Sequence, residues 1–357
     1  MYKVSIITTS NMAYDQRLSK VMATMADLPL EISYMDRGGI RSQKTYFSNG
    51  IFFYLEWNIR LFLYLLKQKP QAIYGADIDT ALSAIFYKFL NPKLVFILDL
   101  HELYTDTPEL LHSPLKRKIW SWVEFWGFRK ADGLITVNTS LQDIFYRRYH
   151  RKAEVISNMP MFKVLDGSEC FNMRKMKVLY YQGALNVGRG LECAIETMSL
   201  LPDWKLWLVG SGDLDCELRT LVKDKGLVDR VVFWGRKLPQ ELPKLAKQAT
   251  IGLNLLESES LNYYYSLANK FFDYMQVGLP SVNMDFPEYR NILQNHKTGV
   301  VIKDLHAEVL REAIHSMTQD VNVYRTYVNQ SLEAAKVYTW ENEADKLKQL
   351  LSRQFFG

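Results

Sequence analysis

The sequence contains few cysteines and no pattern that would pair them. Its 357 residues include only Cys170, Cys193 and Cys216, an odd number at spacings that match no zinc site. This argues against a disulfide framework and favours a reducing compartment. We therefore expect a cytoplasmic protein without a structural metal.

Long apolar runs are also missing. The nearest is residues 51–66, which Glu56, Asn58 and Arg60 interrupt, so its uninterrupted pieces are far below the roughly 20 residues that span a bilayer. We interpret it as a largely buried amphipathic helix with Glu56 and Arg60 paired at four-residue spacing. The first nine residues, MYKVSIITT, resemble a buried strand more than a signal peptide.

Charge is modest in total but uneven along the chain. The net charge is +5, from 44 Lys and Arg against 39 Asp and Glu. Residues 1–165 hold 21 basic and 15 acidic side chains, a balance of +6, which leaves 23 against 24, or −1, for the rest. A basic first half suits an anionic partner such as a membrane or a phosphate-bearing acceptor, although a solvated surface also explains it.

Strand-like apolar runs alternate with helical periodicity throughout, which predicts an α/β fold with parallel sheets. The first half predicts strands near 4–9, 31–35, 72–74, 94–99, 133–137 and 154–156. The second predicts strands near 177–181, 205–209, 231–233, 251–255, 281–283 and 300–302. Two doubly wound halves of similar size predict two Rossmann-like domains with ligands bound between them, at the carboxyl ends of the strands.

The domain boundaries follow from this pattern. We predict a first domain over residues 1–160, a second over 161–336, and a terminal helix over 337–357 that crosses back to the first domain. Thr339 is a predicted N-cap with Asn342 at the position of a capping-box partner. Ala344, Leu347 and Leu350 then recur at helical spacing, which gives an apolar stripe that needs a tertiary contact.

Residues 266–280, SLANKFFDYMQVGLP, carry the most informative motif. Ser266 or Asn269 can cap a helix whose N-terminus favours a phosphate, and Lys270 adds a positive charge. Asp273 lies one turn further and can accept hydrogen bonds from ribose hydroxyls. An ordinary capped helix with a solvated Lys–Asp pair explains the spacing equally well.

This segment resembles the donor-binding motif of family 4 (group 1) retaining glycosyltransferases with the GT-B fold, in the subgroup Ser-x-x-x-Lys-x-x-Glu-Tyr-Met-x-x-Gly-x-Pro. The resemblance implies that Asp273, in the place of the family's Glu, binds the donor ribose. The wider family has another Glu eight residues earlier, where this sequence has Tyr265. That departure removes any role carried by a pair of glutamates.

The resemblance continues along the second half. Residues 180–192, YYQGALNVGRGLE, are similar to the loop that opens the family's C-terminal domain, which implies that Gly183 and Arg189 approach the donor diphosphate. Gly210, after a strand, resembles the lining of the donor pocket. Arg236 follows a segment similar to the nucleobase loop, where a solvated charge is the equal alternative.

In the first half, two segments resemble loops on the family's acceptor side. Asp15 and Arg17 lie in DQRL, and His101 and Glu102 lie in LDLHELY after a predicted strand. The resemblance implies that these four residues lie near the acceptor, with His101 positioning the sugar or acceptor. Together with Arg189 and Lys270, which would offset charge on the leaving diphosphate, His101 completes the expected catalytic set.

Asp77 and Asp79 form an Asp-x-Asp pair after a short strand, a pattern that holds a divalent metal in another glycosyltransferase fold. Because GT-B enzymes bind their donor in the other domain, we interpret the pair as a strand-end turn and helix cap. No metal and no cofactor is expected; the nucleoside diphosphate sugar is a substrate.

Residues 114–130, PLKRKIWSWVEFWGFRK, interleave basic and aromatic side chains. Such a helix suits an anionic bilayer surface, and packing of its aromatic face on a sheet, with the cations in solvent, is the competing interpretation. No nucleic-acid-binding motif is present.

The leading hypothesis is a cytoplasmic enzyme, peripheral on the inner face of the cell membrane, that transfers a hexosyl or N-acetylhexosaminyl group with retention of configuration. The donor is a nucleoside diphosphate sugar, and the acceptor a glycan or lipid-linked glycan in cell-envelope or extracellular polysaccharide synthesis. The alternatives are a nucleotide-sugar-binding protein without transfer activity and a GT-B-like sugar epimerase.

Overall fold

The computed structural model describes residues 1–38, 45–47, 50–107, 110, 113–162 and 177–357. The chain forms two compact units. Unit 1 holds Met1–Asn158, Ser260–Asn262 and Trp340–Gly357, and unit 2 holds Met159–Glu259 and Tyr263–Thr339. The break after Asn158 lies two residues before the expected one. Cys170 and residues 163–176 lie outside the described residues.

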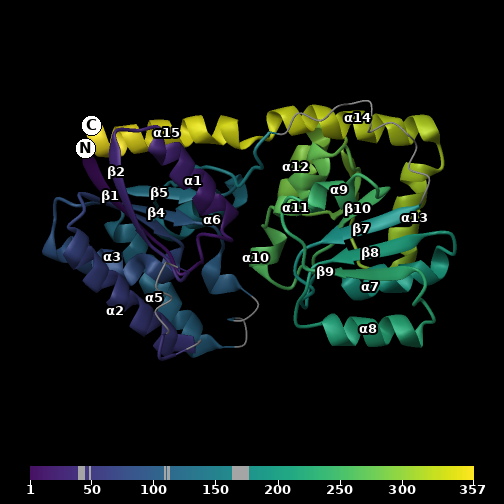
Figure 1. Cartoon of the computed structure of the whole chain (residues 1–357), viewed down its shortest axis with the longest axis horizontal. Coiled ribbons are helices and arrows are strands. Elements are labelled where there is room, and N and C mark those ends of the chain that lie inside the picture. Colours follow the sequence, from purple (N-terminus) through teal and green to yellow (C-terminus); the bar gives the residue numbers. More distant parts are fainter. Residues whose placement is uncertain (39–44, 48–49, 108–109, 111–112, 163–176) are drawn as a thin grey trace. The chain divides into compact units, whose positions relative to one another are not determined.

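Unit 1 is built on a parallel six-stranded sheet in the order β2-β1-β3-β4-β5-β6 (Figure 1). Its strands are β1 (Tyr2–Ile7), β2 (Leu30–Met35), β3 (Ala72–Ala76), β4 (Val95–Leu100), β5 (Gly133–Thr136) and β6 (Glu154–Val155). Its helices are α1 (Gln16–Ala26), α2 (Gly50–Gln68), η1 (Ile78–Thr80), α3 (Ala81–Leu90), η2 (Tyr104–Asp106), α5 (Pro114–Lys130), α6 (Thr139–Tyr149) and α15 (Trp340–Phe356).

Helix α15 packs with α1 on one face of this sheet, while α2, α3 and α5 lie together on the other (Figure 1). Trp340, Leu347 and Leu351 are buried in the same core as Val4 and Tyr74. The Trp340 indole N–H also donates to the Thr24 hydroxyl over 3.1 Å. At the chain ends, the ring of Tyr2 stacks on that of Phe355, with 5.3 Å between centroids.

Unit 2 is built on a second parallel sheet in the order β12-β11-β10-β7-β8-β9. Its strands are β7 (Val178–Gln182), β8 (Lys205–Val209), β9 (Val231–Gly235), β10 (Ile251–Asn254), β11 (Ser281–Met284) and β12 (Gly299–Ile302). Its helices are α7 (Leu191–Thr197), η4 (Met198–Leu200), α8 (Asp215–Asp224), α9 (Leu242–Ala246), α11 (Asn269–Gln276), α12 (Pro287–Asn295), α13 (Ala307–Thr318) and α14 (Val321–Val337), while α10 (Leu261–Tyr264) begins in the unit 1 segment and ends in unit 2.

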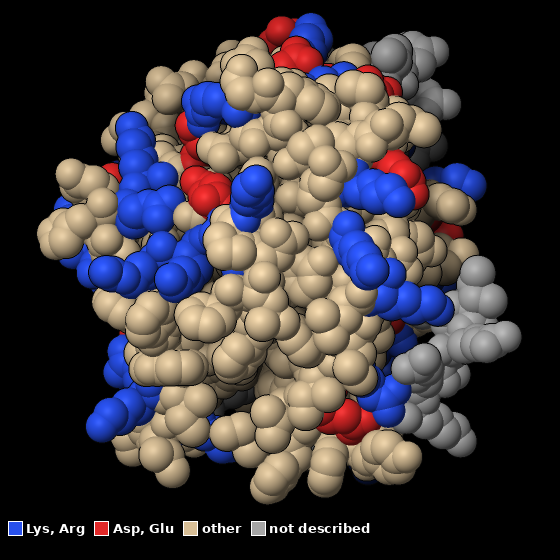
Figure 2. All heavy atoms as spheres, turned by 90° about the vertical axis from the view of Figure 1, so that its left-hand side faces the viewer, with Lys and Arg blue, Asp and Glu red and all other residues tan. Residues whose placement is uncertain are grey.

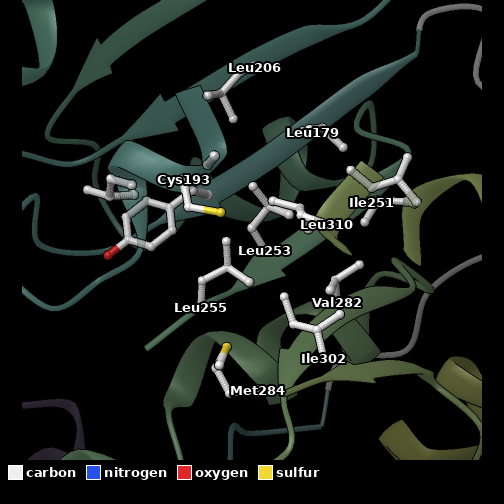
Figure 3. Packing of buried hydrophobic residues seen from close by; sticks show 14 of the residues in the cluster. Leu179, Cys193, Leu206, Ile251, Leu253, Leu255, Val282, Met284, Ile302 and Leu310 are labelled. Atoms are coloured by element: carbon white, nitrogen blue, oxygen red, sulfur yellow. The ribbon is translucent and has the colours of Figure 1, made fainter. Parts of the chain in front are cut away.

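Both faces of the second sheet are buried, as in parallel sheets covered by helices on each side. Along β7, Leu179 and Tyr181 enter one apolar core and Val178 and Tyr180 the other, as the alternation of side chains along a strand requires. Figure 3 shows the first core, to which Leu179, Leu253 and Cys193 belong. Cys193 is a core side chain, and its burial raises the pKa of the thiol to about 11.

Helix α2 differs from its sequence interpretation. It begins at Gly50, and the predicted Glu56–Arg60 ion pair is confirmed, at 2.6 Å. However, the helix is not largely buried. One of its faces exposes a run of large apolar side chains, namely Ile51, Phe52, Leu55, Ile59, Leu63 and Leu66. Among the described residues, no helix is both long and apolar enough to span a membrane.

Candidate functional site

The first candidate site forms in unit 2 where β7 and β8 end in glycines. Gly183 has φ +140° and Gly210 has φ +153°. The Gly183 N–H donates to the Val209 carbonyl over 3.0 Å. A Cβ atom on Gly210 would lie 1.8 Å from the Gly183 carbonyl oxygen, so glycine is required there. The backbones therefore approach closely at the carboxyl edge of the sheet.

Lys270, in the first turn of α11, points toward this edge. A Cβ atom on Gly183 would lie 3.4 Å from its Nζ. The side chain is 7% exposed, and Nζ lies 3.8 Å from the ring centroid of Tyr181. Within the described part of the chain, Nζ is buried without a hydrogen-bond partner. Burial, followed by the nearby charge of Arg189, lowers the Lys270 pKa well below its usual value.

Arg189 lies in the loop between Gly188 and Gly190, which have φ +80° and +63°. Its guanidinium carbon lies 4.7 Å from the ring centroid of Tyr263. The Nε atom is buried and, like Lys270 Nζ, has no hydrogen-bond partner among the described residues. An unpaired buried cation such as Lys270 is costly, and together with the half-buried guanidinium of Arg189 it makes a site for a polyanion such as a diphosphate.

Asp273 lies three residues after Lys270 on the same helix and is partly buried. The Gln182 amide donates to Asp273 Oδ2 over 2.7 Å, and the Tyr180 hydroxyl donates to Gln182 Oε1 over 3.2 Å. These bonds hold a carboxylate at the end of β7. Sequence reasoning gave no role to Gln182 or to the rings of Tyr181 and Tyr263; a polar residue ending a buried strand was the available signal for Gln182.

The remaining expected donor residues are placed less centrally. The capping prediction is wrong, because α11 has Ala268 at its N-cap and no side-chain cap. Asn269 is already helical, and the Ser266 hydroxyl donates to the Tyr263 carbonyl over 2.8 Å. Arg236 is exposed beyond the end of β9. Of the expected donor set, the structure brings Gly183, Gly210, Arg189, Lys270 and Asp273 to one edge of the second sheet.

A second candidate site, a charge network, lies within unit 1 at the carboxyl ends of β3 and β4. Arg17 donates to both oxygens of Asp99, from Nε over 2.9 Å and from Nη2 over 2.8 Å. The Tyr74 hydroxyl donates to the same carboxylate. Asp99 is fully buried, and although burial alone raises its pKa, Arg17 and His101 hold that pKa well below the usual range.

His101 is held between two carboxylates. Its Nε2 lies 3.0 Å from Asp99 Oδ2, and its Nδ1 lies 3.0 Å from Asp77 Oδ2. Burial alone lowers the His101 pKa, but Asp77 and Asp99 outweigh burial and raise it to about 10. The ring is therefore a cation at neutral pH with both N–H groups donated, which leaves it no lone pair with which to act as a general base.

Asp77 occupies the N-cap position of η1, as predicted, but its side chain makes no capping hydrogen bond. Its Oδ1 instead accepts the His101 backbone N–H over 2.9 Å. Its φ of +62° is rare for a residue with a side chain. Asp79 is buried and accepts the Thr9 hydroxyl. Burial and then the Asp77 charge raise its pKa to about 7.

The expected acceptor-side residues divide into three roles. Arg17 and His101 meet through Asp99. Asp15 caps α1, where its Oδ1 accepts the Leu18 N–H over 2.9 Å. Glu102 lines an apolar pocket of about 600 Å³ between α2 and α5. Within the described ranges, no group of three or more His, Cys, Asp or Glu side chains is arranged to hold a metal ion.

Comparison with known proteins gives a family-model match within the second half and a fold for the whole chain. Residues 176–320 match the family model described as Glycosyl transferases group 1. No curated protein matches the sequence. Among solved structures, a sucrose-phosphate synthase from Thermosynechococcus elongatus is similar at TM-score 0.81 and 16% identity, over 100% of this chain and 99% of that one.

Two further structures have the same fold. HepE of Anabaena, solved with UDP-glucose, is similar at TM-score 0.76 and 15% identity, over 99% of this chain and 100% of that one. WaaG, a glycosyltransferase involved in lipopolysaccharide biosynthesis, is similar at TM-score 0.70 and 13% identity, over 96% and 99% of the two chains. The expected GT-B architecture, with two Rossmann-like parallel sheets, is confirmed.

Proposed function

We propose that this chain, which has the GT-B fold and whose residues 176–320 match the group 1 glycosyltransferase family model, transfers a sugar from a nucleoside diphosphate sugar to a glycan or lipid-linked acceptor with retention of configuration. The observation that carries this proposal is the pair of buried nitrogens, Lys270 Nζ and Arg189 Nε, that lack a partner among the described residues. A donor diphosphate supplies the anion that both require.

The proposed chemistry follows from these charges. The bond between the anomeric carbon and the β-phosphate oxygen breaks, and negative charge grows on the departing diphosphate. Lys270 and Arg189 offset that charge without a metal ion. The departing phosphate takes the proton of the acceptor hydroxyl while the acceptor oxygen forms its bond to the anomeric carbon. Asp273 accepts the ribose hydroxyls of the donor.

Unit 1 contributes positioning in this proposal. Because both ring nitrogens of His101 already donate to carboxylates, its role is a fixed positive charge and not proton removal. Arg17 and Asp99 hold that charge at the end of β4. In this proposal Gly210 and Arg236 also line the donor side of the site, and Glu102 lies on the acceptor side.

We propose a uridine diphosphate hexose or N-acetylhexosamine as donor, because UDP and UDP-glucose occupy structures of the similar HepE. A role in envelope or extracellular polysaccharide synthesis is supported by the similarity to WaaG, which is involved in lipopolysaccharide biosynthesis. We propose that the protein binds the inner membrane face. This is supported by the exposed cations Lys116 and Lys118, which lie on the same helix as the exposed ring of Trp122.

One observation favours a second function, nucleotide-sugar binding without transfer. Tyr265 occupies the place of a family glutamate, and its ring packs edge to face on that of Tyr264 at 4.9 Å. An aromatic ring there offers no carboxylate to the donor sugar. Donor hydrolysis in the absence of acceptor separates the enzyme from this binding protein, and sugar transfer to an added glycan separates it from an epimerase.

A thermal-shift panel of nucleoside diphosphates and their sugars tests the proposal. A ligand at one hundred times its dissociation constant stabilises the protein by about 2.7 kcal/mol. We expect UDP to raise the melting temperature of the wild type and to leave that of Arg189→Ala almost unchanged. The proposal fails if no nucleoside diphosphate or its sugar stabilises the wild type.

A further inference from the structure

The proposed transfer chemistry uses only Glu102 of an apolar pocket in unit 1. The pocket has a volume of about 600 Å³, within the range of ligand sites. Its walls come mainly from α2, α5 and residues 102–107 and 110, through side chains such as Leu55 and Ile119, and α3 adds Leu82. We refer to it as the α2–α5 pocket.

The uncharged polar groups in the wall of this pocket are already bonded to the protein, and its charged side chains are Glu102 and Lys116. The Tyr104 hydroxyl donates to the Tyr54 hydroxyl over 3.1 Å. The Thr107 hydroxyl donates to the Tyr104 carbonyl over 3.1 Å. The rings of Tyr54 and Tyr104 pack on Trp120, with centroids 5.0 and 4.7 Å away. An occupant therefore gains from burying hydrocarbon more than from offering hydrogen bonds.

The pocket is continuous with an exposed apolar surface. Ile51, Leu55 and Ile119 line it and are also exposed. From Ile51 and Leu55 the exposed face of α2 continues to Ile59 and Leu63, one turn at a time. Figure 2 views unit 1 from the side that carries α2 and α3 and shows mostly uncharged side chains, with more Lys and Arg than Asp and Glu. Such a surface suits the interface of an anionic membrane.

Positive charge lies beside the pocket. Lys116 lines it and is exposed, whereas Lys118, half a turn further along α5, is outside the lining. Lys116 has no ion-pair partner among the described residues, whereas the adjacent Arg117 pairs with Asp106. On α2, the charges of Glu56 and Arg60 neutralise each other. An anionic group at the mouth of the pocket would thus meet the uncompensated charge of Lys116.

We propose that the α2–α5 pocket binds the hydrocarbon chain of a phosphate-bearing lipid, with the phosphate against Lys116. This inference rests on the proposed function, since it makes the acceptor's lipid, or a lipid of the membrane that carries it, the ligand of unit 1. Apolar walls take the acyl or isoprenoid chain, and Lys116 selects an anionic headgroup.

Leu55 and Leu63 provide a matched pair of variants. Both are leucines on the outer face of α2, 54% and 58% exposed, but only Leu55 lines the pocket. Leu55→Trp places a ring in the mouth of the pocket, and Leu63→Trp adds the same ring to the surface two turns away. Because both sites are exposed, both variants should fold; Ile119→Trp repeats the test from the α5 wall.

The test is calorimetric titration of the full chain with methyl, butyl, octyl and farnesyl phosphate. We expect affinity to rise up to about fourfold per buried methylene, the factor that corresponds to hydrocarbon burial. Leu55→Trp should weaken farnesyl phosphate binding about tenfold, and Leu63→Trp less than twofold. Equal effects of the two substitutions, or affinity independent of chain length, would overturn the proposal.

Vesicle binding distinguishes the two possible sources of the bound hydrocarbon chain, which are bulk membrane lipid and the acceptor. If it comes from bulk lipid, Leu55→Trp weakens binding to vesicles of phosphatidylcholine and phosphatidylglycerol more than Leu63→Trp does. If it comes from the acceptor, the two variants bind those vesicles alike, and added farnesyl phosphate strengthens binding of Leu63→Trp only. UDP-induced stabilisation, measured in parallel, tests the transferase proposal separately. If UDP does not stabilise the wild type, the transferase proposal is wrong. If UDP stabilises the wild type but the lipid titrations fail, only the proposal of a lipid-binding pocket is wrong.

Discussion

Lys270 shows most clearly how a single residue can be kept for binding at the expense of stability. Its ammonium group is buried against Tyr181 without a hydrogen-bond partner in the described part of the chain. Burial of an unpaired charge disfavours the folded state. The residue therefore makes the free protein less stable than an apolar side chain of similar length would.

The first prediction concerns Lys270→Met. We expect the variant without ligand to melt at a higher temperature than the wild type, by about 2–4 °C for each kcal/mol gained, and to lose its stabilisation by UDP. Lys223→Met, which removes an exposed lysine from α8, is the control and should change neither property. A lower melting temperature together with an intact UDP response would contradict this account.

The second prediction concerns Asp273→Asn. Since Gln182 holds the carboxylate at the end of β7, we expect UDP binding to weaken by about 1–3 kcal/mol, the usual value of a charge-assisted hydrogen bond. The substitution should not change the affinity for 2′,3′-dideoxyuridine diphosphate, which lacks the ribose hydroxyls. Titration calorimetry with both nucleotides checks this, with Asp224→Asn on the surface of α8 as control. An equal loss of affinity for both nucleotides would show that Asp273 does not bind the ribose hydroxyls.

At the scale of elements, the charge network of unit 1 joins α1, β3, β4 and the loop after β3. Breaking a buried ion pair by removing one partner costs about 3–5 kcal/mol, and the Arg17–Asp99 pair is 3% and 0% exposed. The third prediction is that Asp99→Asn lowers the free energy of unfolding of unit 1 by that amount in urea titrations. A cost below 1 kcal/mol would show that the network is dispensable.

The fourth prediction is a pH dependence due to His101. Its pKa of about 10 in the folded chain exceeds its ordinary value of about 6.5. Its stabilising contribution is therefore complete below pH 6.5 and is lost as the pH rises toward 10, by up to about 1.4 kcal/mol per pH unit. Urea midpoints of unit 1 should fall from pH 8 to 10 in the wild type and stay flatter in His101→Gln. Starting at pH 8 avoids Asp79, whose pKa is about 7.

Helices and strands were predicted well where a short stretch of sequence carries their pattern. Apolar runs located the strands of both sheets, and the helix predicted over residues 51–66 is α2. The exposure of the apolar face of α2 could not be predicted, since burial depends on which elements pack against it.

The site was predictable only in part for the same reason. The motif around Lys270 and Arg189 marked the cations, because their chemistry follows from residue type and order. The bond of Gln182 to Asp273 spans 91 positions and that of Arg17 to Asp99 spans 82. No local pattern signals such pairs, so Asp77 looked like a helix cap and His101 like an available imidazole.

At the scale of the molecule, α15 is as much a part of unit 1 as its own strands. Trp340, Leu347 and Leu351 are buried in the core that contains Val4. The fifth prediction is that a chain shortened to end at Thr339 loses the unfolding transition of unit 1 in calorimetry but keeps a transition that UDP stabilises. Leu347→Asp should act in the same direction, and Gln349→Ala on the exposed side of α15 should not. Survival of both transitions after shortening would contradict this assignment.

The stacking of Tyr2 on Phe355 has a topological consequence. The two chain ends lie side by side in unit 1, where Met1 and Gly357 are exposed (Figure 1). Proteins with neighbouring ends tolerate circular permutation. A few glycine and serine residues can close the ends into a ring, and the exposed turn at Gly226, between α8 and β9, offers a place to reopen it. In such a permutant α15 is followed directly by β1, so the last helix and the first strand become neighbours in sequence. Their contact is then local and can form before unit 2 is complete.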